Sequence, residues 1–176
     1  MEIVYIVITM VYNGEWCIKR LFDSLLNTKR NFVHIIYNDG SIDNTNFLIN
    51  EYITNARKVG IDVIYFNNLK NKGNDYATKH CLKYVVEHYS KDNHWCFWIN
   101  ADDYVESKIF ICLDNYILKY NSYDFFNISK KEFFIKENKI KNKKIKSKHV
   151  KDKDLLPCLI LDLDFYWSIF LFRVLF

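Results

Sequence analysis

Apolar segments of strand length alternate with amphipathic helical segments along the first hundred residues. The strand-like segments, at residues 3–10, 32–37, 61–66 and 95–99, are rich in β-branched and aromatic side chains. The helical segments between them lie at residues 18–26, 43–58 and 75–89. This order predicts an α/β fold with a mostly parallel central sheet and right-handed crossovers, in a single domain that spans residues 1–176.

Polar residues follow each predicted strand, at residues 12–15, 38–43, 67–73 and 100–103. Parallel sheets bind their ligands at the carboxyl ends of the strands, so the four loops are expected to share one crevice. The four glycines of the chain lie too far apart to form a dinucleotide-binding glycine loop or a P-loop. The sequence therefore excludes two common ways of binding a nucleotide and leaves the crevice residues to be considered.

Three carboxylates, Asp39, Asp102 and Asp103, belong to these loops. Carboxylates that meet in a crevice repel one another unless they bind a cation or a hydrogen-bond donor. Asp102 is the candidate ligand for Mg²⁺ or Mn²⁺, which take one or two carboxylates together with phosphate oxygens. Asp39 is expected to accept a hydrogen bond from a nucleobase, and Tyr12 to stack on it. Considered singly, each residue is better explained by turn, capping or packing chemistry.

Taken together and in order, four motifs resemble the inverting GT-A glycosyltransferases of the large bacterial-type family 2. The motifs read VYIVITMVYNGEWCIKRLFDSLL, IIYNDGSIDNT, NKGNDYATKH and FWINADDYVES. The resemblance covers residues 3–110 and implies a GT-A, Rossmann-like sandwich whose nucleotide-sugar-binding half spans residues 3–104. It also implies metal-dependent transfer of a hexose from a UDP-linked donor to a glycan or glycolipid acceptor, as in polysaccharide biosynthesis, with Mn²⁺ or Mg²⁺ as cofactor.

The resemblance assigns roles by position in the motifs. Tyr12 takes the position that packs on the base, Asp39 the position that bonds it, and Asp102 the position that holds the metal and the diphosphate. The residues that it implies for nucleotide-sugar binding are Tyr12, Asn13, Glu15, Asp39, Lys72, Gly73, Asn100, Asp102 and Asp103.

Some positions depart from the family pattern. Asn38 and Asn100 replace customary aspartates, which lowers the negative charge of the crevice and predicts weaker metal binding. The third motif lacks the family's arginine after Ala77, so Lys72 or Lys79 is a candidate for the missing cation. The alternative is that both are simply exposed lysines in a lysine-rich chain.

Residues 105–176 are expected to form an incomplete acceptor-side region. In the family, a carboxylate in this part takes the proton of the acceptor hydroxyl as general base. Asp162 and Asp164 are the weak candidates for that base in this sequence. The alternative hypothesis is a catalytically silent protein that binds the nucleotide-sugar without transferring it. Nucleotidyltransferases share the sheet and the metal, but they open with a glycine-rich loop that this chain lacks.

The net charge of +4 comes from one segment, residues 130–153, which holds eleven lysines against three acidic residues. A solvated hairpin or loop is the preferred interpretation, and no nucleic-acid partner is expected. A nucleic-acid-binding arm is the alternative, which a steep salt dependence of oligonucleotide binding would favour.

The five cysteines show no zinc-site spacing and predict buried free thiols in a reducing, cytoplasmic compartment. The apolar N-terminus lacks the features of a signal peptide and is interpreted as a strand. The C-terminal segment at residues 167–176, WSIFLFRVLF, is very apolar. Three interpretations of this segment are open: a homodimer interface, a peripheral membrane contact, or the edge of a missing partner segment.

Overall fold

The computed structural model describes residues 3–89 and 93–119 and, beyond them, five strands. The elements of the first part are β1 (Val4–Val11), α1 (Ile18–Leu26), β2 (Val33–Asn38), α2 (Thr45–Lys58), β3 (Asp62–Asn67), α3 (Asn74–His88), β4 (His94–Trp98) and α4 (Ile109–Lys119). The five later strands are β5 (Phe125–Ile128), β6 (Lys131–Lys136), β7 (Lys139–Lys144), β8 (His149–Val150) and β9 (Ile169–Arg173). The predicted alternation of strands and helices is confirmed, with boundaries that differ by at most two residues.

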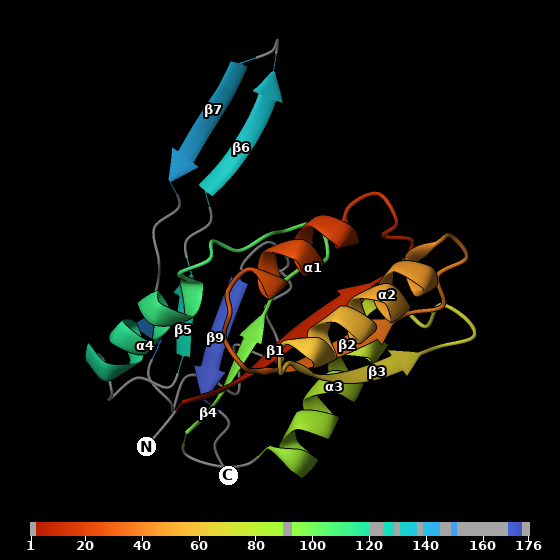
Figure 1. Ribbon diagram of the computed structural model, residues 1–176, viewed down its shortest axis with the longest axis horizontal. Helices are drawn as coiled ribbons and strands as arrows, with labels where there is room; N and C mark the ends of the chain where they lie inside the picture. The colour runs from red at the N-terminus through yellow and green to blue at the C-terminus, as the bar shows by residue number, and fades with distance from the viewer. Residues whose placement is uncertain are drawn as a thin grey trace.

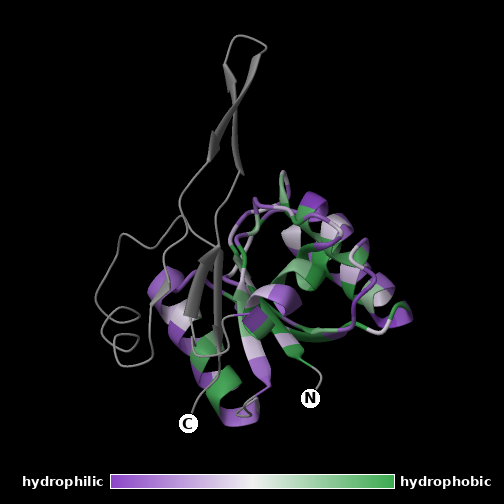
Figure 2. Cartoon of the chain, turned by 90° about the vertical axis from the view of Figure 1, so that its left-hand side faces the viewer, coloured by the Kyte–Doolittle hydropathy of each residue, from purple (hydrophilic) through white to green (hydrophobic). Residues whose placement is uncertain are grey.

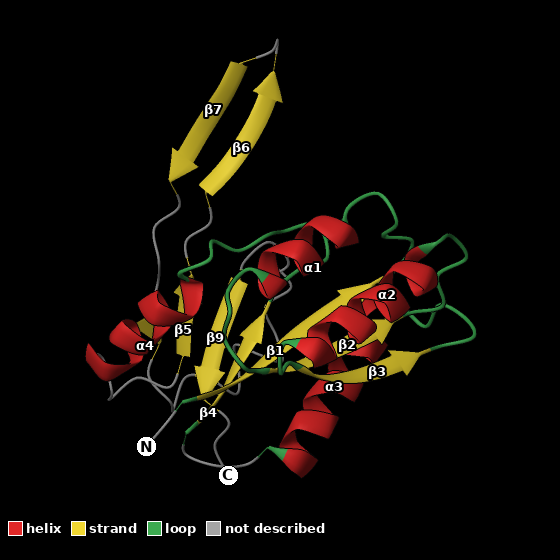
Figure 3. Cartoon of the chain, in the orientation of Figure 1, coloured by secondary structure: helices red, strands yellow, loops and turns green. Residues whose placement is uncertain are grey.

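The main sheet has the strand order β3-β2-β1-β4-β9-β5-β8 (Figures 1 and 3). The first four strands are all parallel to one another, as the crossover pattern predicts. β9, β5 and β8 extend the sheet through antiparallel pairs. The α/β prediction is confirmed, and the antiparallel extension begins where the regular alternation ends.

Helices cover both faces of the sheet, because successive residues of its strands point to opposite sides. On β1, Tyr5 and Val7 belong to one core cluster, which also contains the buried residues of α1, α2 and α4. Ile6 and Ile8 belong to the other cluster, which contains the buried residues of α3. The helices carry their apolar stripes toward the sheet and their polar stripes outward (Figure 2). The sheet is thus the middle layer of a three-layer sandwich.

The apolar C-terminal segment is an interior strand for at least residues 169–173. β9 pairs with β4 on one side, where Trp95 lies opposite Arg173, and with β5 on the other. A strand paired on both sides needs no further partner for its backbone edges. Residues 169–173 are therefore paired on both backbone edges, and a strand position accounts for their β-branched and aromatic composition.

The lysine-rich segment contains a two-stranded hairpin. β6 pairs with β7 in antiparallel register, from Lys131 opposite Lys144 to Lys136 opposite Lys139, in a ribbon separate from the main sheet (Figure 1). A hairpin is one of the two forms that the sequence allows for this segment, and residues 131–136 and 139–144 have it. The stretches 145–148 and 151–153 lie outside the described residues, so the nucleic-acid alternative stays a prediction.

The described cysteines are free thiols. Cys17, Cys81 and Cys96 are buried as expected, whereas Cys112 is exposed on α4. Burial raises the pKa of Cys81 to about 12, so this thiol is neutral and unreactive at physiological pH. Within the described part of the chain, no helix is long and apolar enough to cross a membrane.

His34 is a fully buried titratable group in the core under α1 and α2. Its ring nitrogens lie 2.8 Å from the Tyr52 hydroxyl and 3.1 Å from the Thr9 hydroxyl. Burial lowers the pKa of His34 to about 3, so the ring is neutral in the folded protein but protonates in the unfolded chain below about pH 6.5.

We therefore expect the free energy of unfolding to fall as the pH drops below about 6.5, by up to about 1.4 kcal/mol per pH unit. Below this pH the unfolded state binds a proton at His34 that the folded state does not bind. Lowering the pH therefore favours the unfolded state. Urea denaturation at pH 7.5, 6.0 and 5.0 measures the slope. His34→Leu lowers stability at every pH, but its slope should be flatter; an unchanged slope would assign the pH dependence to other groups.

Candidate functional site

The loops that follow β1, β2, β3 and β4 lie at one edge of the sheet. In Figure 1 the first three of these loops gather beyond the arrowheads of their strands. β1 lies between β2 and β4, with Val11 opposite Asn38 and Ile8 opposite Trp98. Neighbouring strands are about 4.8 Å apart, so β2 and β4 are separated by about 10 Å across β1. The segments that carry Asp39 and Asp102 therefore leave the sheet at the same edge, on either side of β1, with β4 ending three residues earlier along β1 than β2.

Asn13 and Glu15 connect the loop after β1 to the loop after β2. The backbone N–H of Asn13 donates to the Ser41 hydroxyl at 2.9 Å, and its side-chain oxygen accepts from the backbone N–H of Ile42 at 2.9 Å. The Glu15 carboxylate accepts from the backbone N–H and the side-chain amide of Asn44, at 3.1 and 2.7 Å. These two predicted binding residues hold the first loop against the second, which fixes the shape of the edge.

Asp43 completes this connection at the start of α2. Its carboxylate accepts from the backbone N–H groups of Thr45 at 3.0 Å and Glu15 at 3.1 Å. Burial alone would raise the pKa of Asp43, but hydrogen bonds from Thr45 and Glu15 outweigh it and hold this pKa below its ordinary value. The N-cap residue of α2 is Asn44, so Asp43 lies one residue before the cap and does not occupy the capping position. Its carboxylate still accepts from the first helical N–H and anchors the loop after β1.

Asp39 is 5% exposed and binds the loop that follows β3. One carboxylate oxygen accepts from the Asn68 side chain at 3.0 Å and from the backbone N–H of Lys72 at 2.9 Å. The other oxygen accepts from the backbone N–H of Gly73 at 2.8 Å. A carboxylate has about four acceptor positions, so three bonds leave one for a further donor such as a base N–H.

Gly40, next to Asp39, allows the same loop to approach closely. Its φ is +74°, and a Cβ at this position would lie 2.4 Å from the carbonyl carbon of Lys70. A side chain would therefore be strained and would collide with backbone. The Asp39-Gly40 pair is turn chemistry, as the conservative interpretation expects, and it also brings the β3–α3 loop onto the carboxylate.

Asn38 occupies a position where the family usually has aspartate, and both ends of its side-chain amide form hydrogen bonds. Its side-chain oxygen accepts from the backbone N–H of Ser41 at 3.2 Å. Its side-chain nitrogen donates to Asn67 Oδ1 at 3.0 Å and to the Tyr65 hydroxyl at 3.2 Å. A carboxylate could not make these two donations, so the substitution has a local reason in how β2 binds β3.

We expect Asn38→Asp to destabilise the protein by about 1–3 kcal/mol, because the new carboxylate would face the Asn67 oxygen and lose both donations. Thermal unfolding at pH 7 measures the effect. Asn67→Asp, which keeps an oxygen acceptor opposite Asn38, is the matched control and should cost less. Equal stability of Asn38→Asp and the wild type would contradict this account of Asn38.

The remaining predicted residues of the first three loops are exposed. Tyr12 is 49% exposed after β1, which leaves much of its ring accessible. The Lys72 ammonium lies 4.4 Å from the centre of the Tyr76 ring and 3.3 Å from its hydroxyl. Lys79 is exposed on α3. Of the two candidate cations, Lys72 is the one whose backbone also bonds Asp39.

The segment after β4 is attached to α1. The Asp102 side chain is exposed, while its backbone carbonyl accepts a hydrogen bond from the Arg20 guanidinium. The backbone N–H of Asp103 donates to the Asn100 carbonyl at 3.1 Å, which forms a turn. Burial and then the negative charge of Asp102 raise the pKa of the Cys17 thiol to about 11. The Arg20 bond places the Asp102 backbone beside the first turn of α1.

The donor set at this end suits a hard divalent cation. Asp102 and Asp103 offer carboxylate oxygens, and Mg²⁺ and Mn²⁺ prefer oxygen ligands with water or phosphate in the remaining positions. Within the described residues there is no group of three or more histidine, cysteine or acidic side chains that could hold a metal by itself. The residues present thus fit a cation that is shared with a bound phosphate.

Sequence reasoning missed the side chains that hold the segment after β4. Arg20 and Ser24 lie four residues apart on α1, and Tyr104 and Val105 belong to the segment itself. The four-residue spacing places Arg20 and Ser24 on one side of the helix, but it does not say what they contact. The candidate bases Asp162 and Asp164 lie outside the described residues and stay predictions.

Comparison with known proteins identifies the class. The sequence model of the family described as Glycosyl transferase family 2 matches residues 6–175, so the chain belongs to this family. No protein among the curated sequences matches the chain. The family match and the GT-A-like sheet confirm the resemblance inferred from the four motifs.

Solved structures share the fold at low sequence identity. S. aureus TarS 1–349 in complex with UDP superimposes with a TM-score of 0.57 at 20% identity, over 70% of this chain and 34% of that one. The same protein with UDP-GlcNAc gives 0.54 at 18% identity, over 70% and 33%. The mannosyltransferase PcManGT from Pyrobaculum calidifontis, in complex with GDP-Man and Mn²⁺, gives 0.57 at 12% identity, over 71% and 35%. The chain spans about a third of the length of these structures.

Proposed function

We propose that the edge formed by the four loops binds a nucleotide-sugar, with UDP as the nucleotide. The observation that carries the proposal is that Asp39 and Asp102 follow parallel strands on either side of β1. Asp39 keeps an acceptor position for a base N–H, and Tyr12 supplies an accessible ring beside it. The complexes of the similar structures with UDP, UDP-GlcNAc and GDP-Man support a donor of this class.

Asp102, with Asp103 beside it, would hold Mn²⁺ or Mg²⁺ against the diphosphate. When bound, such an ion neutralises the charge that develops on the departing nucleoside diphosphate. The PcManGT complex contains Mn²⁺, which supports a metal of this kind. The Arg20 bond to the Asp102 carbonyl would orient the carboxylate-bearing turn without using the carboxylate itself.

The proposed reaction is inverting transfer of a hexose to a glycan or glycolipid acceptor. Inversion by direct displacement needs a base for the acceptor hydroxyl, for which Asp162 and Asp164 remain the candidates. Membership of the glycosyltransferase family supports transfer as the reaction class. A chain that binds the donor without transferring the sugar is the second candidate, and the assay below separates the two.

Thermal unfolding with UDP, GDP and ADP, each with Mn²⁺ and with EDTA, tests the proposal. We expect UDP with Mn²⁺ to raise the melting temperature most and EDTA to remove the effect, since a ligand that binds only the folded state stabilises it. Transfer or hydrolysis of a UDP-hexose then separates an enzyme from a silent binder. If no nucleoside diphosphate stabilises the protein under either condition, the donor-site proposal is wrong.

A further inference from the structure

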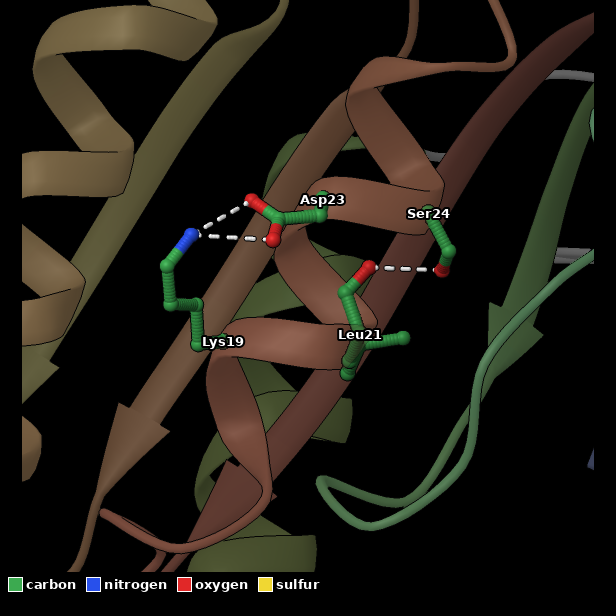
Figure 4. A network of polar contacts seen from close by, with 4 residues as sticks. All are labelled: Lys19, Leu21, Asp23 and Ser24. Atoms are coloured by element: carbon green, nitrogen blue, oxygen red, sulfur yellow. Dashed lines mark hydrogen bonds and ion pairs between the residues drawn. The ribbon is translucent and has the colours of Figure 1, made fainter.

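A hollow of about 500 Å³ lies outside the four-loop edge, on the outer side of α1. The hollow is an open depression of the surface and not an enclosed cavity, and its volume leaves room for one or two sugar rings. Figure 4 shows part of its α1 wall, where Lys19, Asp23 and Ser24 project from neighbouring turns of the helix. The hollow is lined by Lys19, Arg20, Asp23, Ser24, Asn27 and Tyr104.

The far wall is Tyr104, and the structure holds its backbone on both sides. Arg20 donates to the carbonyl of Asp102, two residues before it. The backbone N–H of Val105, one residue after it, donates to the Ser24 hydroxyl at 3.1 Å. Ser24 in turn donates to the Leu21 carbonyl at 2.7 Å, the bond drawn at the right of Figure 4. Tyr104 is thus fixed to α1 while 46% of its surface stays exposed.

The hollow holds one ion pair, Lys19 with Asp23, and one further cation, Arg20, which contacts neutral groups. The Lys19 ammonium bonds both Asp23 oxygens, at 2.9 and 3.1 Å. The Arg20 guanidinium lies 5.4 Å from the centre of the Tyr104 ring and bonds the Asp102 carbonyl. An anionic ligand such as a phosphate would compete with Asp23 for Lys19 and would be repelled by the Asp23 carboxylate. A neutral ligand rich in hydroxyl groups can bind here without displacing these contacts.

The remaining chemistry matches a hexose. An exposed aromatic ring offers an apolar surface for the C–H face of a sugar. The Asn27 amide donates and accepts, and Asp23 accepts, so neighbouring hydroxyl groups of different orientation can be bonded. Asp23 is held by Lys19, and Tyr104 by the contacts of its segment with α1, so these two groups need little ordering on binding.

We propose that this hollow binds a neutral sugar unit of the acceptor glycan, with Tyr104 as the stacking ring and Asp23 and Asn27 as the hydroxyl-bonding side chains. The proposal rests on the proposed donor site, because Tyr104 lies two residues beyond Asp102. A sugar bound here would place the rest of its chain beside the proposed diphosphate position. The hollow thus gives the described part of the chain a contact with acceptor.

Titration of the isotope-labelled protein with chitotriose, maltotriose and mannotriose tests the hollow by NMR. At least one trisaccharide should shift the amide signals of residues 19–27 and 102–105. Tyr104→Ala should weaken that binding about tenfold or more, whereas Tyr104→Phe, which keeps the ring, should stay within about twofold. Asn27→Ala should also weaken it, and Tyr116→Ala, an exposed tyrosine on α4, should not.

The possible results separate this inference from the donor proposal. UDP and Mn²⁺ binding by Tyr104→Ala should equal that of the wild type. If no trisaccharide shifts these signals, or if Tyr104→Ala binds sugar as the wild type does, the sugar hollow is wrong although the donor site stands. Equal shifts with inorganic phosphate would overturn the choice of a neutral ligand. Loss of UDP binding in Tyr104→Ala would show that the ring only supports the Asp102 turn, which also overturns the sugar hollow.

Discussion

Replacing Asp102 by asparagine is expected to abolish the metal-dependent part of UDP binding. The substitution keeps the size of the side chain and its exposed position but removes the charge that a divalent cation requires. Where transfer is measurable, the turnover number should fall by about 10²–10³ or more, because the charge of the leaving diphosphate would lose its neutralising ion. Thermal shifts with UDP, with and without Mn²⁺, and turnover of a UDP-hexose measure the two effects.

Two controls sharpen this experiment. Glu87→Gln removes one negative charge from α3, where Glu87 faces Lys83 at 3.7 Å, and should leave metal-dependent UDP binding unchanged. Asp103→Asn should have a smaller effect than Asp102→Asn if Asp103 only assists. If Mn²⁺ and UDP stabilise Asp102→Asn as much as the wild type, Asp102 does not bind the metal.

Replacing Asp39 by asparagine is expected to lower both stability and UDP affinity. The Asp39 carboxylate accepts three hydrogen bonds, two of them from the backbone N–H groups of Lys72 and Gly73. An amide would turn its NH₂ group toward at least one of these donors and leave it without an acceptor. Hydrogen bonds to buried charged groups contribute about 1.5–3 kcal/mol each, so we expect a loss of about 2–4 kcal/mol. Urea denaturation measures this loss, and calorimetric titration with UDP measures the affinity.

The two consequences of Asp39→Asn must be separated. UDP binding is therefore measured well below the melting temperature of the variant, where the folded population is complete. Asp62→Asn, at an exposed position of β3, is the matched control and should change neither quantity. A variant that loses stability but binds UDP like the wild type would restrict Asp39 to holding the β3–α3 loop.

The sequence predicts where the candidate site lies better than it predicts which residues contact one another there. The rule that ligands bind beyond the carboxyl ends of parallel strands placed Tyr12, Asp39 and Asp102 at one edge, and the strand order agrees. The contacts of Asn13 and Glu15 could not be predicted in the same way. Their partners, Ile42 and Asn44, lie 29 residues away, and their pairing depends on how two loops fold against each other.

Asn38 is a second case in which the sequence did not predict the contacts of a residue. Comparison with the family pattern treated it as a lost carboxylate and led to the expectation of weaker metal binding. The structure shows an amide that donates to Tyr65 and Asn67 on the neighbouring strand. The expected effect on metal binding remains a prediction, but the reason for an amide at this position lies in the pairing of β2 with β3.

The sequence by itself determined the order of strands and helices, because burial on one or both faces leaves a hydrophobic period that can be read along the chain. It also determined which edge carries the polar loops. Only the tertiary structure decided that Arg20 and Ser24 hold the segment around Tyr104, and that β9 lies between β4 and β5. These contacts join residues about 40–80 positions apart. No local pattern encodes such a partner, because hydrogen bonding and packing depend on proximity in space.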